Sequence, residues 1–230
     1  MKIGKLLVAS TVAVALNMLA GAANAVTVTI AFQEAGENGG AITTIATAVN
    51  GVAVAATNYG TFTTNVVTGQ SSPPNVFGNL LSSTASNTSS TAAGTLTIYI
   101  TAQNITGPIG PLSFTSSLTQ NGLPDGWTVT ETTLLSTTNQ LFTGTTLSTN
   151  LFNSIGTFVG NVAADAGAGP YSVTEIYTIV ATAGGGDALS TIRLSAVPGP
   201  IVGAGLPGLA LIMACGSLLA LARRRRQAVI

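Results

Sequence analysis

The sequence predicts an all-β fold, an antiparallel β-sandwich, flanked by an N-terminal signal-peptide helix and a C-terminal transmembrane helix. Apolar and polar residues alternate in several segments, turn dipeptides separate these segments, and no amphipathic helical spacing occurs between Val26 and Ala196. A threonine-rich β-solenoid is the structural alternative, but the sequence has no fixed internal period that would support it.

Period-two alternation predicts strands around residues 26–33, 95–101 and 171–179, because one face of such a strand packs and the other meets solvent. The apolar positions are Val26, Val28, Ile30, Phe32, Leu96, Ile98, Ile100, Tyr171, Val173, Tyr177 and Ile179. Threonine fills most of the alternate positions, and its β-branch favours extended backbone.

Turn residues divide these strands. The dipeptides that accept positive φ are Asn38-Gly39, Asn50-Gly51, Asn121-Gly122 and Asp125-Gly126. Residues 184–187 predict a turn into a last strand around Ile192, whereas Pro73-Pro74 and residues 82–94 predict loops.

The N-terminus, residues 1–25, has the pattern of a cleaved secretory signal. Lys2 and Lys5 precede an apolar run, and Ala23-Asn24-Ala25 forms a small-x-small cleavage site. We therefore expect the mature chain to begin at Val26 and the domain over residues 26–196 to be exported. An uncleaved anchor is the alternative, although the run is short for a membrane span.

The C-terminus, residues 197–230, predicts a membrane anchor. Residues 201–222 carry no charge and reach ~33 Å as a helix, which is long enough to span the hydrocarbon core. The basic group Arg223, Arg224, Arg225 and Arg226 follows and is expected to stay in the cytoplasm, which places the β domain outside it.

The tail Val197-Pro198-Gly199-Pro200, an apolar span and four arginines together resemble the PEP-CTERM sorting signal. The resemblance covers about the last 35 residues and implies a bacterial export from an exopolysaccharide-producing organism, recognised at its proline motif by a membrane protease of the exosortase type. The family motif has glutamate where this chain has Gly199. Processing by a variant sorting enzyme and plain retention in the membrane therefore both remain open, as do transfer to the cell surface and release.

Composition excludes several classes of function. Charged residues are only 6% of the chain, and Arg193 is the single basic residue between Val26 and Ala196, so the domain lacks the basic surface that nucleic acids require. The same region has no histidine, cysteine or lysine, which removes triad nucleophiles, Schiff-base lysines and ordinary zinc sites. No cofactor or metal is expected.

Two options for chemistry survive. Glu131 and Glu175 could serve as the carboxylate pair of a glycosidase, but the interpretation we favour is that they solvate the outer faces of strands. Asp125, Asp165 and Asp187 fall in predicted loops and could bind calcium, but no Asp-x-Asp spacing supports a site.

Two kinds of side chain could engage or carry sugar. Trp127 is expected in the core, with stacking on a sugar as its alternative, and Tyr59, Tyr99, Tyr171 and Tyr177 share that ambiguity. Asn87 and Asn104 begin N-glycosylation sequons, and the serine-rich stretch 82–91 could carry O-linked sugar.

These observations favour a non-catalytic structural or interaction protein of the bacterial envelope or extracellular matrix, not an enzyme. Its expected partners are the membrane, a sorting protease and extracellular polysaccharide. The alternatives are a carbohydrate-binding module, which needs a row of aromatic side chains, and a glycosidase, which needs two carboxylates in a cleft.

Overall fold

The computed structural model describes residues 26–71 and 78–198 of the 230-residue chain. Several of the expected features lie outside the described residues. They are the signal peptide with Ala23 and Ala25, the Pro73-Pro74 loop, Gly199 and Pro200 of the motif, and the span with Arg223 to Arg226. Within those residues, no helix is long and apolar enough to cross a membrane.

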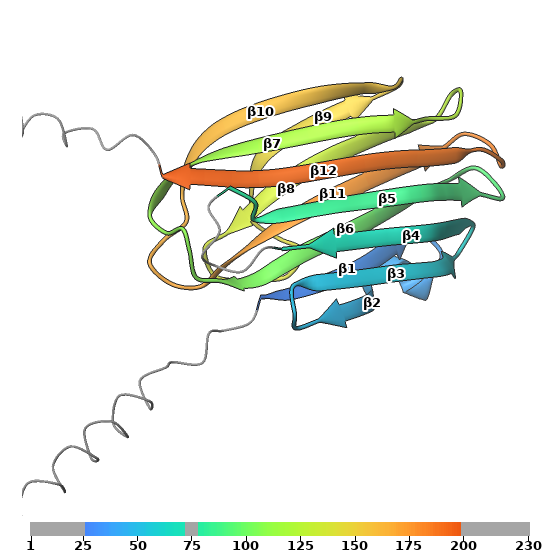
Figure 1. Cartoon of the computed structure of the whole chain (residues 1–230). Coiled ribbons are helices and arrows are strands. Elements are labelled where there is room, and N and C mark those ends of the chain that lie inside the picture. The colour runs from blue at the N-terminus through green and yellow to red at the C-terminus, as the bar shows by residue number, and fades with distance from the viewer. Residues whose placement is uncertain (1–25, 72–77, 199–230) are drawn as a thin grey trace, which may run out of the picture. The chain divides into compact units, whose positions relative to one another are not determined.

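Twelve strands make up the described domain (Figure 1). They are β1 (Thr27–Glu34), β2 (Thr43–Ala48), β3 (Val52–Tyr59), β4 (Phe62–Gln70), β5 (Leu81–Ser90), β6 (Gly94–Ile105), β7 (Pro111–Gly122), β8 (Thr128–Ser136), β9 (Thr145–Phe152), β10 (Gly156–Asp165), β11 (Tyr171–Ala181) and β12 (Asp187–Pro198). One short 3-10 turn, η1 (Asn38–Gly40), follows β1.

The strands form two six-stranded sheets, which confirms the predicted sandwich. One sheet has the order β2-β1-β6-β11-β8-β9 and the other has the order β10-β7-β12-β5-β4-β3. The strand pairings whose residue register is described are all antiparallel. The consecutive strands β2 and β3, and likewise β9 and β10, belong to different sheets, so each of these connections crosses the sandwich at a lateral edge (Figure 1).

The core lies between the sheets, where the alternating apolar residues point as expected. Val28, Ile30 and Phe32 of β1 are fully buried, and the inward residues of β6 and β11 join the same cluster. The sheets approach closely at Gly69 of β4, where an added Cβ would lie 2.4 Å from a methyl carbon of Ile100. Glycine is therefore required there by packing.

The prediction of a loop over residues 82–94 is wrong, because residues 81–90 form β5, an interior strand of its sheet. The inward residues Ser83, Ala85 and Thr88 are buried. The segment resembles a loop in composition because small and hydroxyl-bearing residues fill its inward positions as well as its outward ones. The expected turn at Asn121-Gly122 also differs, since this dipeptide ends β7 and the turn follows at Gly126, with φ of 78°.

The segment between β8 and β9 covers part of the outer face of the first sheet. Asn139 and Asn104 pair through their side chains at 2.8 Å, and the Asn104 amide N–H donates to Asn139 Oδ1 at 2.8 Å. Phe142 packs against Tyr99 with ring centroids 5.6 Å apart. This cover explains why Ser172 and Thr174, which point away from the core, are nevertheless buried.

Candidate functional site

Glu131 and Glu175 lie on neighbouring strands and point into the core. Tyr177 of β11 pairs directly with Glu131 of β8, and Glu175 pairs with Thr133. The two glutamates are therefore diagonal neighbours on adjacent strands, a relation that places Cα atoms about 7–8 Å apart. Both side chains are completely buried. The interpretation that they solvate an outer face is therefore wrong: Glu131 has the parity of Val129, and Glu175 has the parity of Val173.

Glu175 belongs to a hydrogen-bonded group that joins the two sheets. Ser83 of β5 donates from Oγ to Glu175 Oε2, and the same Oγ lies 2.7 Å from the Tyr177 hydroxyl. The Ile192 amide N–H of β12 donates to that hydroxyl at 2.9 Å. One serine and one tyrosine thus link β11 to both β5 and β12.

Gln120 and Ser190 form a second polar contact, on the opposite sheet. Ser190 Oγ of β12 donates to Gln120 Oε1 of β7 at 2.5 Å, and Gln120 Nε2 donates to the Leu189 carbonyl at 3.2 Å. Neither side chain is more than 1% exposed. Neither Gln120 nor Ser190 was expected to have a role, although Gln120 shares the inward parity of Leu118.

Burial changes the acid–base behaviour of both carboxyl groups. It raises the pKa of Glu131 to about 8, with the Thr119 backbone and the Ser190 hydroxyl acting weakly against the rise. It also raises the pKa of Glu175 well above its ordinary value, a shift that Ser83 and the Leu194 backbone oppose and the charge of Glu131 increases. At neutral pH both groups are therefore predominantly uncharged acids.

Three carboxyl oxygens have no hydrogen-bond partner among the described residues: both oxygens of Glu131 and Oε1 of Glu175. A buried charge without a partner is costly, which is consistent with the neutral state. Since neither side chain has exposed surface, a sugar cannot reach the pair while the sandwich is closed. These residues therefore do not line the cleft that the glycosidase alternative requires.

A hollow in the described structure lies elsewhere. It has a volume of about 260 Å³, is formed around the β8–β9 connection and contains neither glutamate. Its lining residues are Leu135, Ser136, Thr137, Thr138, Gln140, Thr143, Gly144 and Thr145. The lining carries hydroxyl groups and no charge, so it offers no acid–base chemistry.

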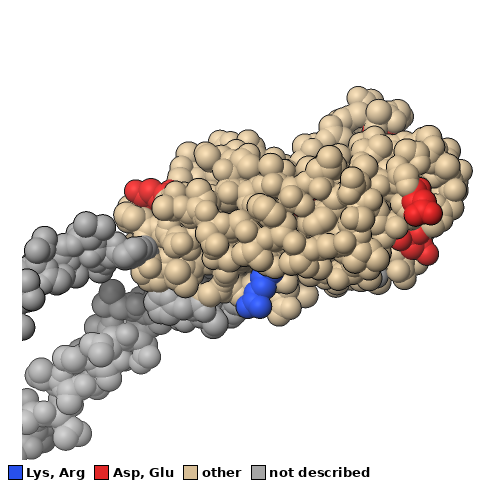
Figure 2. All heavy atoms as spheres, turned by 90° about the horizontal axis from the view of Figure 1, so that it is seen from above, with Lys and Arg blue, Asp and Glu red and all other residues tan. Residues whose placement is uncertain are grey.

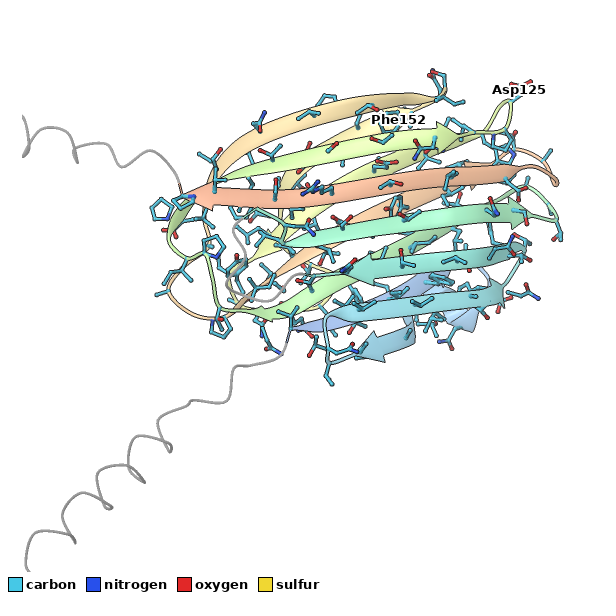
Figure 3. The ribbon with its side chains drawn as sticks, viewed as in Figure 1. Asp125 and Phe152 are labelled. Carbon is cyan, nitrogen blue, oxygen red and sulfur yellow. The ribbon has the colours of Figure 1, made fainter. Side chains whose placement is uncertain are left out.

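The three loop aspartates do not come together. Asp125 stands at the tip of the connection after β7 (Figure 3), and Asp187 begins β12. Asp165 ends β10 opposite Pro111, at the other end of β7. Within residues 26–71 and 78–198, no group of three metal-ligating side chains of the Asp, Glu, His or Cys type is present.

The predicted glycosylation sites differ in access. Asn87 is exposed on β5 with φ of 49°. Asn104 is half-buried, and its amide donates weakly to Thr27 at 3.5 Å while its oxygen accepts from Asn139. A glycan on Asn104 would have to displace these contacts, whereas Asn87 is free to carry one.

Aromatic side chains are mostly interior. Trp127 is 2% exposed and packs edge-on against Phe62, which confirms its expected place in the core, and Tyr171 and Tyr177 are also buried. Phe158 is the one described aromatic residue that is well exposed, at 38%. Tyr59 and Tyr99 are half-buried. The described surface therefore has no row of exposed aromatic rings.

Two residues of the expected sorting motif lie among the described residues. Strand β12 ends at Pro198, and both Val197 and Pro198 are exposed.

Comparisons with known proteins assign no family. No family model matches the chain, and no curated protein matches it. Solved structures similar to parts of the chain include a carbohydrate-binding module in complex with β-1,4-galactotriose, with 8% identity over 64% of this chain and 88% of that one, at a TM-score of 0.29.

Two viral proteins also show partial similarity. The enzymatically active domain of tailspike protein 4 from bacteriophage CBA120 has 12% identity over 64% of this chain and 19% of that one, at a TM-score of 0.31. The structure of infectious bursal disease virus, Gx strain, has 15% identity over 76% of this chain and 52% of that one, at a TM-score of 0.30. Scores this low carry no argument about the function of this chain.

Proposed function

We propose that this chain is an exported, non-catalytic structural protein of the bacterial envelope or extracellular matrix, delivered through its C-terminal tail, and that its β domain contacts neutral polysaccharide. The observation that carries the proposal is the nearly uncharged surface of a rigid sandwich (Figure 2). Of the described charged residues, only Glu37, Asp125, Asp165, Asp187 and Arg193 are exposed. Such a surface attracts neither nucleic acid nor a charged polymer.

Hydroxyl groups replace charges on the outer faces. On the first sheet, Thr97 of β6, Thr178 of β11 and Thr130 of β8 pair in direct register and are all partly exposed. We call these three residues the threonine row. Each hydroxyl both donates and accepts hydrogen bonds, as sugar hydroxyls do. The row therefore offers an extended polysaccharide a flat line of matching groups.

The delivery part of the proposal is tested by intact mass after fractionation of the native host. We expect the protein outside the cytoplasm and starting at Val26, ending near residues 197–200 if the tail is processed and at Ile230 if it is retained. A chain in the cytoplasm that still carries residues 1–25 would overturn the export proposal.

The binding part is tested by co-sedimentation of the mature protein with polysaccharide from the same host. Replacing the threonine row by valine keeps the shape and removes the hydroxyls, so retention should fall several-fold. The matched control replaces Thr63, Thr68 and Thr84, which lie partly exposed on the other sheet. Because charge is not involved, retention should persist in high salt. Equal retention of both triple variants, or breakdown of the polysaccharide, contradicts the proposal.

A carbohydrate-binding module is the second candidate, and one contact favours it. Tyr99 and Phe142 pack together on the outer face of the first sheet, and the Tyr99 hydroxyl donates to Gln33 Oε1 at 2.6 Å. Both rings are half-buried. If sugar stacks on this pair, Phe142→Ala should lower retention more than loss of the threonine row does.

A further inference from the structure

We propose that Gln120 and Ser190 react with each other to form an intramolecular ester between β7 and β12, with Glu131 carrying the proton. The two side chains are 70 residues apart in sequence and meet at 2.5 Å between Ser190 Oγ and Gln120 Oε1. They come from neighbouring strands of one sheet. The nucleophile and the amide that it would attack are thus already in contact.

The amide is held in one orientation. Gln120 Nε2 donates to the carbonyl oxygens of Gly122 and Leu189, so the side chain cannot turn away from Ser190 without losing both bonds. Holding two reacting groups together in this way replaces a bimolecular encounter with an intramolecular step, which is worth many orders of magnitude in effective concentration.

Glu131 projects from the opposite sheet toward the pair formed by Gln120 and Ser190. Glu131 faces inward on β8, two residues from Thr133, whose hydroxyl lies 2.7 Å from that of Ser116 on β7. Its carboxyl group therefore lies over the inward residues of β7, which include Gln120, and the Ser190 hydroxyl opposes the rise in its pKa. Its two oxygens have no hydrogen-bond partner among the described residues, although the side chain is completely buried. Buried carboxyl groups without a partner are rare in folded proteins. A role in proton transfer between Ser190 and the leaving nitrogen explains this one.

The reaction balances without a co-reactant. The step starts from the minor fraction of molecules in which Glu131 is ionised at neutral pH. In these molecules Ser190 turns its hydroxyl from Gln120 Oε1 to Glu131, the carboxylate takes the proton, and Oγ adds to Gln120 Cδ. Glu131 then returns the proton to Nε2, the Cδ–Nε2 bond breaks, and ammonia leaves. The products are one ester bond and one ammonia molecule, no electron is transferred, and Glu131 ends in its starting state.

The buried position of Gln120 and Ser190 favours the ester over its hydrolysis. Gln120 and Ser190 are at most 1% exposed, so water that would hydrolyse the ester is excluded. The region between Val26 and Ala196 has neither cysteine nor lysine, so it cannot form a disulfide or a lysine-derived amide cross-link. An ester that closes the segment between β7 and β12 would restrict the unfolded chain as other cross-links do.

The test is the mass of the full-length mature protein after complete unfolding. Loss of ammonia lowers the mass by about 17 Da relative to the sequence. Succinimide formation at an Asn-Gly site gives the same deficit, so the decisive readout is a chymotryptic map. We expect one covalently joined pair of peptides, one containing Gln120 and the other containing Ser190.

Substitutions test which residues take part in forming the ester. Ser190→Ala should restore the full mass, Ser190→Thr should keep the deficit because it restores a hydroxyl, and Glu131→Gln should slow the appearance of the deficit at least tenfold. The matched control is Ser83→Ala, which alters another buried serine and should leave the linked peptides unchanged. A wild-type protein of full mass overturns the proposal, and so does a wild-type map that lacks the linked peptides; neither result depends on a variant that might fail to fold.

Discussion

Glu131→Gln should remove much of the pH dependence of folding stability. Burial raises the pKa of Glu131 from its ordinary value of 4.5 to about 8. Between those pH values the folded protein holds a proton that the unfolded chain has released. The free energy of unfolding therefore falls as pH rises, by about 1.4 kcal/mol per pH unit for one proton, and this fall ends above the folded-state pKa.

The size of the effect follows from that window. Between about pH 5 and about pH 8, Glu131 alone should lower the free energy of unfolding by roughly 3–4 kcal/mol. Domains of this size are stable by only about 5–15 kcal/mol, so the change is a large share of the total. Glu175, whose pKa is also raised, adds to the fall in the same direction.

The assay is urea unfolding followed by the fluorescence of Trp127, the one tryptophan and a buried one. In wild type, the free energy of unfolding should decline steadily from about pH 5 to about pH 8. In Glu131→Gln the decline should be shallower by about 1.4 kcal/mol per pH unit, because the amide stays neutral in both states, and the part of the decline that Glu175 causes should remain. Since each protein is compared with itself across pH, a cross-link that adds a constant stability does not alter the slope.

Glu37→Gln is the control, since Glu37 is an exposed glutamate. Its slope should match that of wild type. Wild-type stability that is flat or rises over this pH range would refute the reasoning, and so would an unchanged slope in Glu131→Gln.

Three further predictions concern packing and hydrogen bonds, each measured by urea unfolding. Tyr177→Phe should cost about 1–3 kcal/mol by leaving the buried Ile192 N–H without its partner and by removing one of the two partners of Ser83, whereas Tyr171→Phe should be nearly neutral because the Tyr171 hydroxyl has no partner in the described structure. Gly69→Ala should cost about 1–3 kcal/mol because its Cβ would lie 2.4 Å from Ile100, whereas Gly122→Ala meets nothing closer than 3.5 Å and should change little. Asn139→Ala should cost about 1–2 kcal/mol by removing both bonds to Asn104, and hydrogen exchange should quicken over residues 137–144. Equal effects within either pair, or unchanged exchange in the third, would contradict these explanations.

The strands could be predicted because alternation is a local property. Val28, Ile30 and Phe32 define their buried face without knowledge of any partner strand. The same rule identifies the inward position of Glu175, two residues from Val173 and two from Tyr177. The error about the glutamates arose from weighing charge above parity, since ionised carboxylates rarely lie inside. An uncharged carboxylic acid meets no such penalty.

The polar contacts could not be predicted because they depend on sheet order. Ser83 meets Glu175 across 92 residues of sequence, and Ser190 meets Gln120 across 70. The first contact follows from the packing of β5 against β11 of the other sheet, and the second follows from the place of β12 beside β7. Nothing in the spacing of serines along residues 81–90 indicates an interior strand, because hydroxyl groups at inward positions give the composition of a loop.

The distribution of polar groups connects the fold to its proposed role. Charge is sparse on the outer surface, while Glu34, Glu131 and Glu175 are buried. Inside the sandwich, hydroxyl and carboxyl groups join opposite sheets at defined points, such as Ser116 with Thr133 at 2.7 Å and Ser83 with Tyr177 at 2.7 Å. Apolar contacts alone would tolerate a sliding of one sheet over the other, but these bonds fix the sheets in one alignment. A domain whose polar groups hold it rigid from within can leave its outer face neutral, which suits contact with an uncharged matrix.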